Sequence, residues 1–203
     1  MSSKYLDVRR HILDTAKPMI LGKGFTAVGL NEILAAADVP KGSFYHYFKS
    51  KEHFGEVLLD TYFSEYQMQM ESLLDSEGLT AAQRLMSYWA QWLESQCGDG
   101  QDGKCLAVKL SAEVADFSET MRDALQRGTN RIIDNLAACV REGLADGSLD
   151  GELDPYQTAQ TLYEMWLGAT LLTKLRRNRS ALEGAMAATL KMLNLEAQTA
   201  LQS

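Results

Sequence analysis

The residues best suited to chemistry lie in two short stretches of the sequence. The first stretch runs from Lys41 to Lys51 and combines lysines with hydroxyl groups, an imidazole and a glycine. Ammonium groups neutralise phosphates, and Ser, Tyr and His side chains bond phosphate oxygens or base edges. The second stretch surrounds Cys105, which stands in the first turn of a predicted helix. Unpaired N–H groups at a helix start favour a thiolate there, and Lys104 and Lys109 add positive charge, so Cys105 is a candidate reactive cysteine.

The spacing within the first stretch separates a buried side from an exposed one. On a helix, Phe44 and Phe48 lie four residues apart and both face the core, which leaves the polar side chains on other faces. A short apolar helix precedes this one, and Asp38 and Pro40 predict a tight turn between them. Two short helices joined in this way predict a helix-turn-helix, whose second helix enters the DNA major groove. A solvated basic helix with two core aromatics is the structural alternative.

Helix-period patterns recur along the whole chain, and no β-alternation persists for more than a few residues, so we expect an all-α fold. Thr80 with Gln83, Ser180 with Glu183, and the pair Asp154–Pro155 mark helix starts. Pro18 predicts a kink in the last turn of the first helix. The predicted helices, about nine, cover residues 4–21, 30–37, 40–47, 51–74, 81–96, 104–115, 119–144, 155–177 and 181–194.

Composition limits the class of protein. The chain has 203 residues, of which 46% are apolar and 23% charged, and no run approaches the roughly 18 apolar residues of a membrane-spanning helix. The N-terminus lacks the pattern of a signal peptide, so we expect a cytoplasmic protein. The first 55 residues carry eight basic and five acidic side chains, whereas the remainder carries twelve and twenty-two. This difference indicates a separate nucleic-acid-binding module, although so small an excess also fits chance.

The three cysteines are expected to be free thiols. They cannot all pair within one chain, and no CxxC or Cys/His cluster offers zinc ligands, so we expect no metal and no cofactor. Cys97 ends a predicted helix, where the helix dipole disfavours a thiolate, and Cys139 lies between apolar residues inside a long helix. Both are predicted to be packing residues. Cys105 has the same alternative, because a free cysteine is commonly a small buried apolar side chain.

The residues Gly24–Phe25 and the run from Asn31 to Glu52 resemble the DNA-binding domain of TetR-family transcriptional repressors. The resemblance implies a DNA-binding domain at 1–50 and an effector-sensing and dimerisation domain at 51–203. Asp38 replaces the usual turn glycine, and Gly29 stands where a phosphate-binding Thr or Ser is common. The implied DNA-binding residues are Asn31, Lys41, Gly42, Ser43, Tyr45, His46, Tyr47, Lys49 and Lys51, the last against a phosphate at the start of its helix.

A second resemblance covers residues 103–114, which are similar to the electrophile-responsive subgroup of the same family. By that resemblance, the residue matching Cys105 senses electrophiles and oxidants, and Lys174 is the matching lysine that could pair with the thiolate. Lys109 is the further candidate for a charge near the cysteine. Lys174 can equally be a snorkelling lysine at a helix end, because three arginines follow it closely.

Two further features bear on partners. Trp89, Trp92, Tyr163 and Trp166 could line a small-molecule pocket, although aromatics at helical spacing are usually core. The last two predicted helices carry apolar residues around much of their circumference, which predicts a homodimer. These residues are Leu162, Met165, Trp166, Leu171, Leu182, Met186, Leu190 and Leu193.

We therefore expect a homodimeric repressor that binds a palindromic double-stranded operator and is released by a small electrophile or oxidant. A repressor induced by a reversible apolar ligand is the alternative. A thiol-dependent enzyme is the weakest reading, because His11, His46 and His53 all lie in or beside the DNA-binding segment and leave Cys105 without a base. We expect no enzyme.

Overall fold

The computed structural model describes residues 3–97 and 106–195, which form nine α-helices and no strand. The expected all-α fold is therefore confirmed within these ranges. None of the described helices is long and apolar enough to cross a membrane. The helices are α1 (Ser3–Lys23), α2 (Leu30–Ala36), α3 (Lys41–Tyr47), α4 (Lys51–Leu74), α5 (Ala81–Cys97), α6 (Leu106–Val114), α7 (Glu119–Asp146), α8 (Pro155–Arg176) and α9 (Ser180–Met192).

The chain divides into two compact units, each built from two segments. Residues 1–64 and 104–128 form the first, here the head unit, and residues 65–103 and 129–203 form the second, here the body unit. The head unit therefore contains α6 and the beginning of α7 in addition to the first three helices and the start of α4. The domain boundary predicted after residue 50 stays a prediction.

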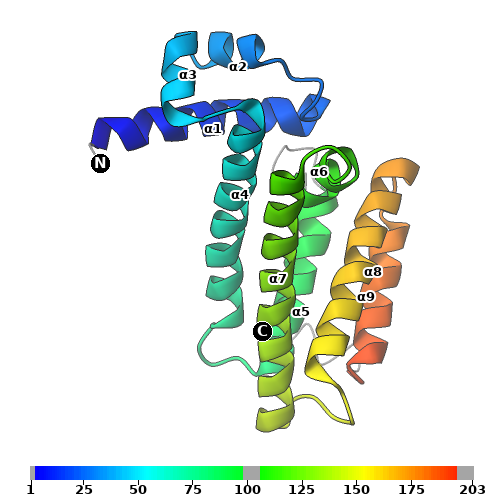
Figure 1. The fold of residues 1–203 in the computed structure, drawn as a ribbon. Helices are drawn as coiled ribbons and strands as arrows, with labels where there is room; N and C mark the ends of the chain where they lie inside the picture. The colour runs from blue at the N-terminus through cyan, green and yellow to red at the C-terminus, as the bar shows by residue number, and fades with distance from the viewer. Residues whose placement is uncertain (1–2, 98–105, 196–203) are drawn as a thin grey trace. The chain divides into compact units, whose positions relative to one another are not determined.

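In the head unit, α2 packs on α1 and α3 packs on α2 (Figure 1). The apolar faces of these helices meet in a core whose side chains are fully buried, among them Ile12, Ile20, Ile33, Phe44 and Phe48. Helix α1 continues through Pro18 and ends at Lys23, two residues beyond the predicted end at Leu21. The kink expected at Pro18 stays a prediction.

The turn between α2 and α3 has the predicted geometry at Asp38 but not at Pro40. Asp38 adopts φ 51°, in the left-handed region that a short polar side chain tolerates better than most. Pro40, at φ −63°, occupies the N-cap position of α3, so this helix begins at Lys41 rather than at Pro40. The ring of Pro40 fixes a conformation that leads into the helix, and its missing N–H would have no helical partner.

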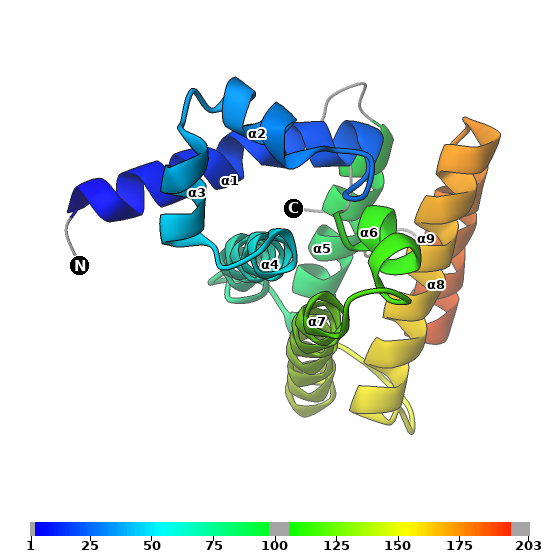
Figure 2. The same ribbon diagram turned by 45° about the horizontal axis from the view of Figure 1, so that its top comes forward.

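In the body unit, α8 and α9 lie side by side in both views (Figures 1 and 2). Two helix starts follow the predicted caps. Oε1 of Gln83 accepts from the Thr80 N–H at 2.9 Å, and Oγ1 of Thr80 accepts from the Gln83 N–H at 3.3 Å, which is a complete capping box for α5. Oδ1 of Asp154 accepts from the Gln157 N–H at 2.7 Å at the start of α8.

The cap predicted at Ser180 is wrong. Arg179 holds the N-cap position of α9 and makes no side-chain cap, while Ser180 is already helical. The Ser180 hydroxyl instead bonds Oδ1 of Asn178 at 2.6 Å, which also accepts from the Ser180 N–H at 3.2 Å. Asn178 thus accepts from the Ser180 N–H, which the capping box would have paired with the Glu183 side chain, and it also takes the Ser180 hydroxyl proton, because Asn side chains bond local backbone readily.

The eight apolar residues expected to face a second copy differ in burial, and Met165, Met186 and Leu190 are half-buried. Leu162, Trp166, Leu182 and Leu193 are buried within the body unit itself and so are already packed without a second copy. Three leucines at the end of α8 remain exposed: Leu171 at 50%, Leu172 at 38% and Leu175 at 71%. An exposed group of large apolar side chains on one helix end marks a candidate interaction surface.

Candidate nucleic-acid interface

Helix α3 is held from behind by aromatic rings. The ring centroid of Phe44 lies 5.0 Å from that of Phe48 and 5.6 Å from that of Phe54, and all three rings are fully buried. The prediction that Phe44 and Phe48 face the core is therefore confirmed. Because these rings fix the rotation of a seven-residue helix, the opposite face of α3 must point outward.

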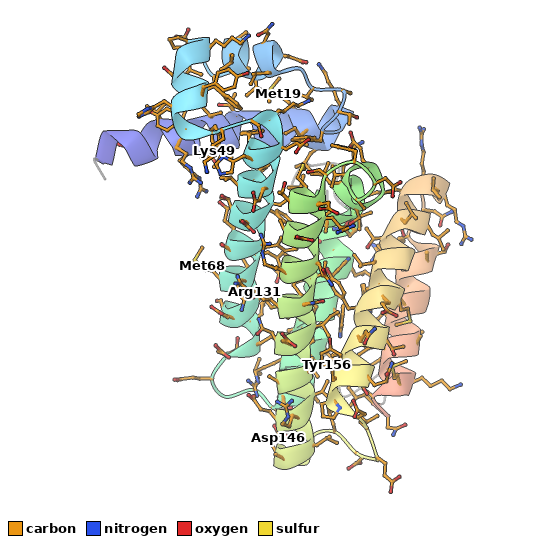
Figure 3. All side chains as sticks on the ribbon, viewed as in Figure 1. Met19, Lys49, Met68, Arg131, Asp146 and Tyr156 are labelled. Carbon is orange, nitrogen blue, oxygen red and sulfur yellow. The ribbon has the colours of Figure 1, made fainter. Side chains whose placement is uncertain are left out.

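That outward face carries most of the predicted DNA-binding residues. Lys41, Gly42, Tyr45 and His46 are exposed on α3, while Ser43 and Tyr47 are half-buried. Asn31, in the first turn of α2, and Lys49, in the connection between α3 and α4 (Figure 3), are also exposed. All of them belong to the head unit.

The connection into α4 is fixed by two local hydrogen bonds. Oγ of Ser50 accepts from the His53 N–H at 3.0 Å, which confirms Ser50 as the cap of α4. Nδ1 of His53 accepts from the Lys49 N–H at 3.1 Å. The backbone that carries the Lys49 ammonium is thereby tied to the first turn of α4.

Lys51 has an intramolecular partner in addition to the predicted phosphate. Its Nζ donates to the carbonyl oxygen of Phe25 at 2.8 Å and lies 4.8 Å from the centroid of the Phe25 ring. Burial lowers the pKa of Lys51, against an opposing effect of the Glu113 charge. An ammonium has three donors, so the phosphate contact stays a prediction, but Lys51 also supports the loop between α1 and α2.

A carboxylate that the sequence analysis missed fixes the other side of this loop. Oε2 of Glu113, on α6, accepts from the Phe25 N–H at 3.0 Å, and Oε1 accepts from the Thr26 N–H at 2.6 Å. The Thr26 hydroxyl donates to the same Oε1. Burial opposes ionisation of this carboxyl, but the hydrogen bonds from Thr26 and Phe25 outweigh it and keep the pKa of Glu113 below its usual value.

Gly24 permits this approach. Its φ of +96° is rarely open to other residues, and a Cβ there would lie 2.8 Å from Oε2 of Glu113. A signal for the contact existed in the sequence. Glu113 follows Leu106 by seven residues and Leu110 by three, so a charged side chain interrupts the buried stripe of α6 and needs a partner.

The predicted sensing residues are only partly described. Cys105 lies outside the described residues, and α6 begins at the next residue, Leu106. Lys109 is half-buried one turn before Glu113, and its charge helps to lower the pKa of that carboxyl. Lys174 is exposed near the end of α8 and belongs to the body unit, whereas Lys109 belongs to the head unit. The pairing of either lysine with Cys105 stays a prediction.

The other two cysteines differ in what is known of them. Cys139 is buried, its Sγ donates to the carbonyl oxygen of Ala81 at 3.5 Å, and burial raises its pKa to about 12. Its predicted role as a packing residue is confirmed. Cys97 is the last residue of α5, and its side chain lies outside the described part of the structure.

The four aromatic residues proposed for a pocket are in contact with one another in the body unit. The rings of Trp89 and Trp166 stack with centroids 4.9 Å apart, and those of Trp92 and Tyr163 meet at 5.8 Å. All four side chains are buried, and Nε1 of Trp92 donates to Thr170 while Nε1 of Trp166 donates to Thr189, both at 2.9 Å. Packing is thus their evident role, and a ligand-binding role stays a prediction.

Comparison with known families decides the class of protein. Residues 12–56 match the model of bacterial regulatory proteins of the tetR family, and residues 81–189 match that of the tetracyclin repressor-like C-terminal domain. The chain belongs to the TetR family. The two matched regions contain the helix-turn-helix and most of the body unit.

Individual relatives are HTH-type transcriptional repressors. The chain is 42% identical over 181 residues to the HTH-type transcriptional repressor NemR of Escherichia coli, covering 89% of this chain and 91% of NemR. It is 35% identical to the repressor DhaR of a Mycobacterium species, covering 87% of each chain.

Solved structures agree with the family assignment. The crystal structure of E. coli NemR in its reduced form superposes with a TM-score of 0.88 at 41% identity, covering 94% of this chain and 99% of that one. A putative TetR/AcrR-family regulator superposes with a TM-score of 0.82 at 43% identity, covering 92% and 98%. The chain is therefore a TetR-family, DNA-binding transcriptional repressor similar to NemR, and its families and relatives are regulators rather than enzymes.

Proposed function

We propose that this repressor is a homodimer whose release from its operator follows modification of Cys105 by a small electrophile or oxidant. The observation that carries the sensing half is the position of Cys105 directly before α6, in a chain so similar to NemR. The fact that NemR has been crystallised in a form described as reduced supports a redox-active relative. We also propose that the protein works in the cytoplasm, where its DNA target would lie.

The DNA-binding half rests on the exposed face of α3. Lys41 and Lys49 would neutralise phosphates, while Tyr45 and His46 would reach base edges in the major groove. Two copies related by a twofold axis would present two such helices to half-sites about one turn of DNA apart, which requires a palindromic operator.

The proposed chemistry is an addition to the Cys105 thiolate. With an electrophile such as N-ethylmaleimide, the sulfur forms a bond to one alkene carbon, the carbon–carbon π bond breaks, and the other carbon takes a proton from water. A helix start and a nearby lysine favour the thiolate that this reaction needs. The adduct releases DNA if it is better accommodated in a conformation that does not bind the operator.

The test uses cysteine-to-serine variants and a duplex selected from a random-sequence pool by the parent protein. Cys105→Ser is expected to bind this duplex like the parent and to stay bound after exposure to N-ethylmaleimide, quinones or hypochlorite. Cys97→Ser and Cys139→Ser are expected to dissociate normally. Release of Cys105→Ser to the same extent as the parent would refute the thiol mechanism.

One observation keeps a reversible apolar ligand as the second candidate. Nε1 of Trp89 is buried and has no hydrogen-bond partner within the described part of the chain, so a ligand acceptor could pair with it. If Cys105→Ser responds like the parent, this reading takes the place of thiol chemistry. The thiol-dependent enzyme remains the weakest alternative, and catalytic turnover of a quinone or aldehyde would be needed to support it.

A further inference from the structure

The loop between α1 and α2 is held by groups from two other helices of the head unit. Glu113 of α6 accepts hydrogen bonds from the N–H groups of Phe25 and Thr26, and Lys51 of α4 donates to the Phe25 carbonyl. Phe117, just after α6, stacks on the Phe25 ring with centroids 6.4 Å apart. Residues at positions 25 and 26 are therefore fixed through their backbone rather than through side-chain packing alone.

This loop leads directly into the DNA-binding helices. Helix α2 begins at Leu30, and the Gly29 carbonyl accepts from the N–H groups of Glu32 and Ile33, so the loop sets where α2 starts. The N-cap of α2 has no side-chain hydrogen bond of its own. A seven-residue helix without such a cap depends on tertiary contacts to fix its position.

We propose that Glu113 is a positioning residue for DNA binding: its carboxylate holds the loop before α2 and so keeps α2 and α3 in the arrangement that fits the groove. Two independent observations support this role. Three donors converge on one carboxylate, and Gly24 supplies both the left-handed backbone and the space that this approach requires. Hydrogen bonds to an ionised group are stronger than those between neutral groups.

Removal of the Glu113 charge should change the DNA affinity in the direction opposite to that expected from net charge alone. Removal of a negative charge should strengthen binding to a polyanion if charge alone matters. Glu113→Gln should instead weaken it, because one carboxylate oxygen becomes an NH₂ group that faces an N–H donor. Glu77→Gln is the matched control, since it removes the same charge from an exposed turn in the body unit.

The same contact also offers a path from α6 to the helix-turn-helix. Glu113 lies near the end of the helix that begins next to Cys105, so a displacement of α6 would move the acceptor away from the Phe25 and Thr26 N–H groups. This regulatory half rests on the proposed function, whereas the positioning half rests only on DNA binding.

The experiment measures the affinity of the full-length, reduced protein for the selected duplex, together with hydrogen exchange of the Phe25 and Thr26 amides. Glu113→Gln is expected to weaken binding about three- to tenfold and to speed exchange at these two amides, with Glu77→Gln at or slightly below the parent Kd. Thr26→Val, which removes only the hydroxyl donor, should weaken binding less. When Thr26→Val is already present, Glu113→Gln should reduce the affinity for the duplex by a smaller factor than it does in the parent, because the two residues share one hydrogen bond.

The proposal is wrong if Glu113→Gln binds the duplex as tightly as Glu77→Gln, or if the loss of affinity caused by Glu113→Gln is the same with and without Thr26→Val. If Glu113→Gln fails to fold, parent-like affinity of folded Thr26→Val overturns the role. For the regulatory half, Glu113→Gln should show a smaller ratio of Kd after and before N-ethylmaleimide than the parent, and an equal ratio refutes it. If the parent itself does not respond, the proposed function fails while the affinities above still decide the positioning role.

Discussion

Burial keeps the Cys139 thiol protonated. Cys139 lies against the Ala81 carbonyl in the body unit, and burial raises its pKa to about 12 in spite of the neighbouring Arg84 charge. Since the thiolate rather than the thiol is the nucleophile, we expect Cys139 to react very slowly with electrophiles near neutral pH.

We predict that N-ethylmaleimide leaves Cys139 unlabelled in the native protein at pH 7 to 8, because the thiolate fraction is very small and the sulfur is covered. Peptide mapping by mass spectrometry would show the label on Cys139 only after unfolding in urea. Native labelling at the rate of a small free thiol would contradict this placement of the sulfur.

Glu113 should make stability depend on pH in one direction. Its pKa is below the usual 4.5 in the folded chain, so its contribution is complete above about pH 4.5 and is lost as the pH falls through the lower folded pKa. The charge of Lys109 on its own helix also lowers the pKa of Glu113, and the Glu113 charge in turn acts on Lys51 of α4.

We therefore predict that the parent exceeds Glu113→Gln in free energy of unfolding by about 1–2 kcal/mol near pH 7. This is somewhat less than the roughly 1.5–3 kcal/mol of a hydrogen bond to a charged group, because Glu113 is only half-buried and solvent screens its charge. The difference should shrink below pH 4.5. Urea unfolding at pH 7, 5 and 4 would measure it. A difference that grows on acidification would mean that the folded pKa is raised rather than lowered.

The sequence pattern predicted the burial of side chains that follow helical periodicity, but it did not predict hydrogen bonds between residues far apart in the chain. Phe44 and Phe48 could be assigned to the core because a four-residue spacing defines one helix face. The Glu113 contact joins residues almost ninety positions apart in sequence. No local rule connects such positions, and the same holds for the contact of Lys51 with Phe25.

At the scale of elements, the exposed residues on and beside α3 suit two kinds of DNA contact, one to phosphates and one to base edges. Exposed lysines beside it have the chemistry for phosphates, whereas Tyr45, 51% exposed, and His46 have groups that suit base edges. These two roles respond differently to salt and to DNA sequence.

We predict that Lys49→Gln weakens binding to all duplexes and reduces the slope of log K against log salt by about 0.9 per lost phosphate contact, or twice that when both copies contribute. Tyr45→Phe and His46→Gln should instead change the preferred sequence. Lys191→Gln, exposed on α9, is the charge-matched control. An unchanged salt slope for Lys49→Gln would remove Lys49 from the phosphate contacts.

Element boundaries were predictable where one local rule operates. The bounds of α4 matched, and the caps at Thr80 and Asp154 form as expected, because each depends on residues within one turn. The start of α9 was misassigned because Asn178, rather than Glu183, accepts from the Ser180 N–H that the predicted capping box requires. The order of competing local hydrogen bonds depends on geometry that the sequence does not contain.

At the scale of the whole molecule, the exposed end of α8 bears on assembly. Leu171 and Leu175 lie four residues apart on one face of the helix and are 50% and 71% exposed. If a second copy covers them, the dimer is stabilised by about 25 cal/mol of free energy for each Å² of apolar surface that is removed from water.

We predict that the double variant Leu171→Glu, Leu175→Glu shifts the protein from dimer to monomer at micromolar concentration, because like charges would face each other across the interface. Light scattering with size exclusion would report the change toward the 22.5 kDa chain mass, and operator affinity should fall with it. Met68→Glu, on an α4 side chain that is 63% exposed, is the control (Figure 3). A parent protein that is already monomeric would refute the homodimer.

The division of the head unit into two segments has a consequence for synthesis. Residues 1–64 leave the ribosome first, but the unit also needs residues 104–128, which include Glu113 and α6. At a translation rate of about 5–20 residues per second, residue 128 is added roughly 3–13 s after residue 64. Body-unit residues 65–103 therefore emerge before Glu113 does, and a chain that stalls before α6 contains α1 to α3 without the Glu113 carboxylate that accepts from the Phe25 and Thr26 N–H groups.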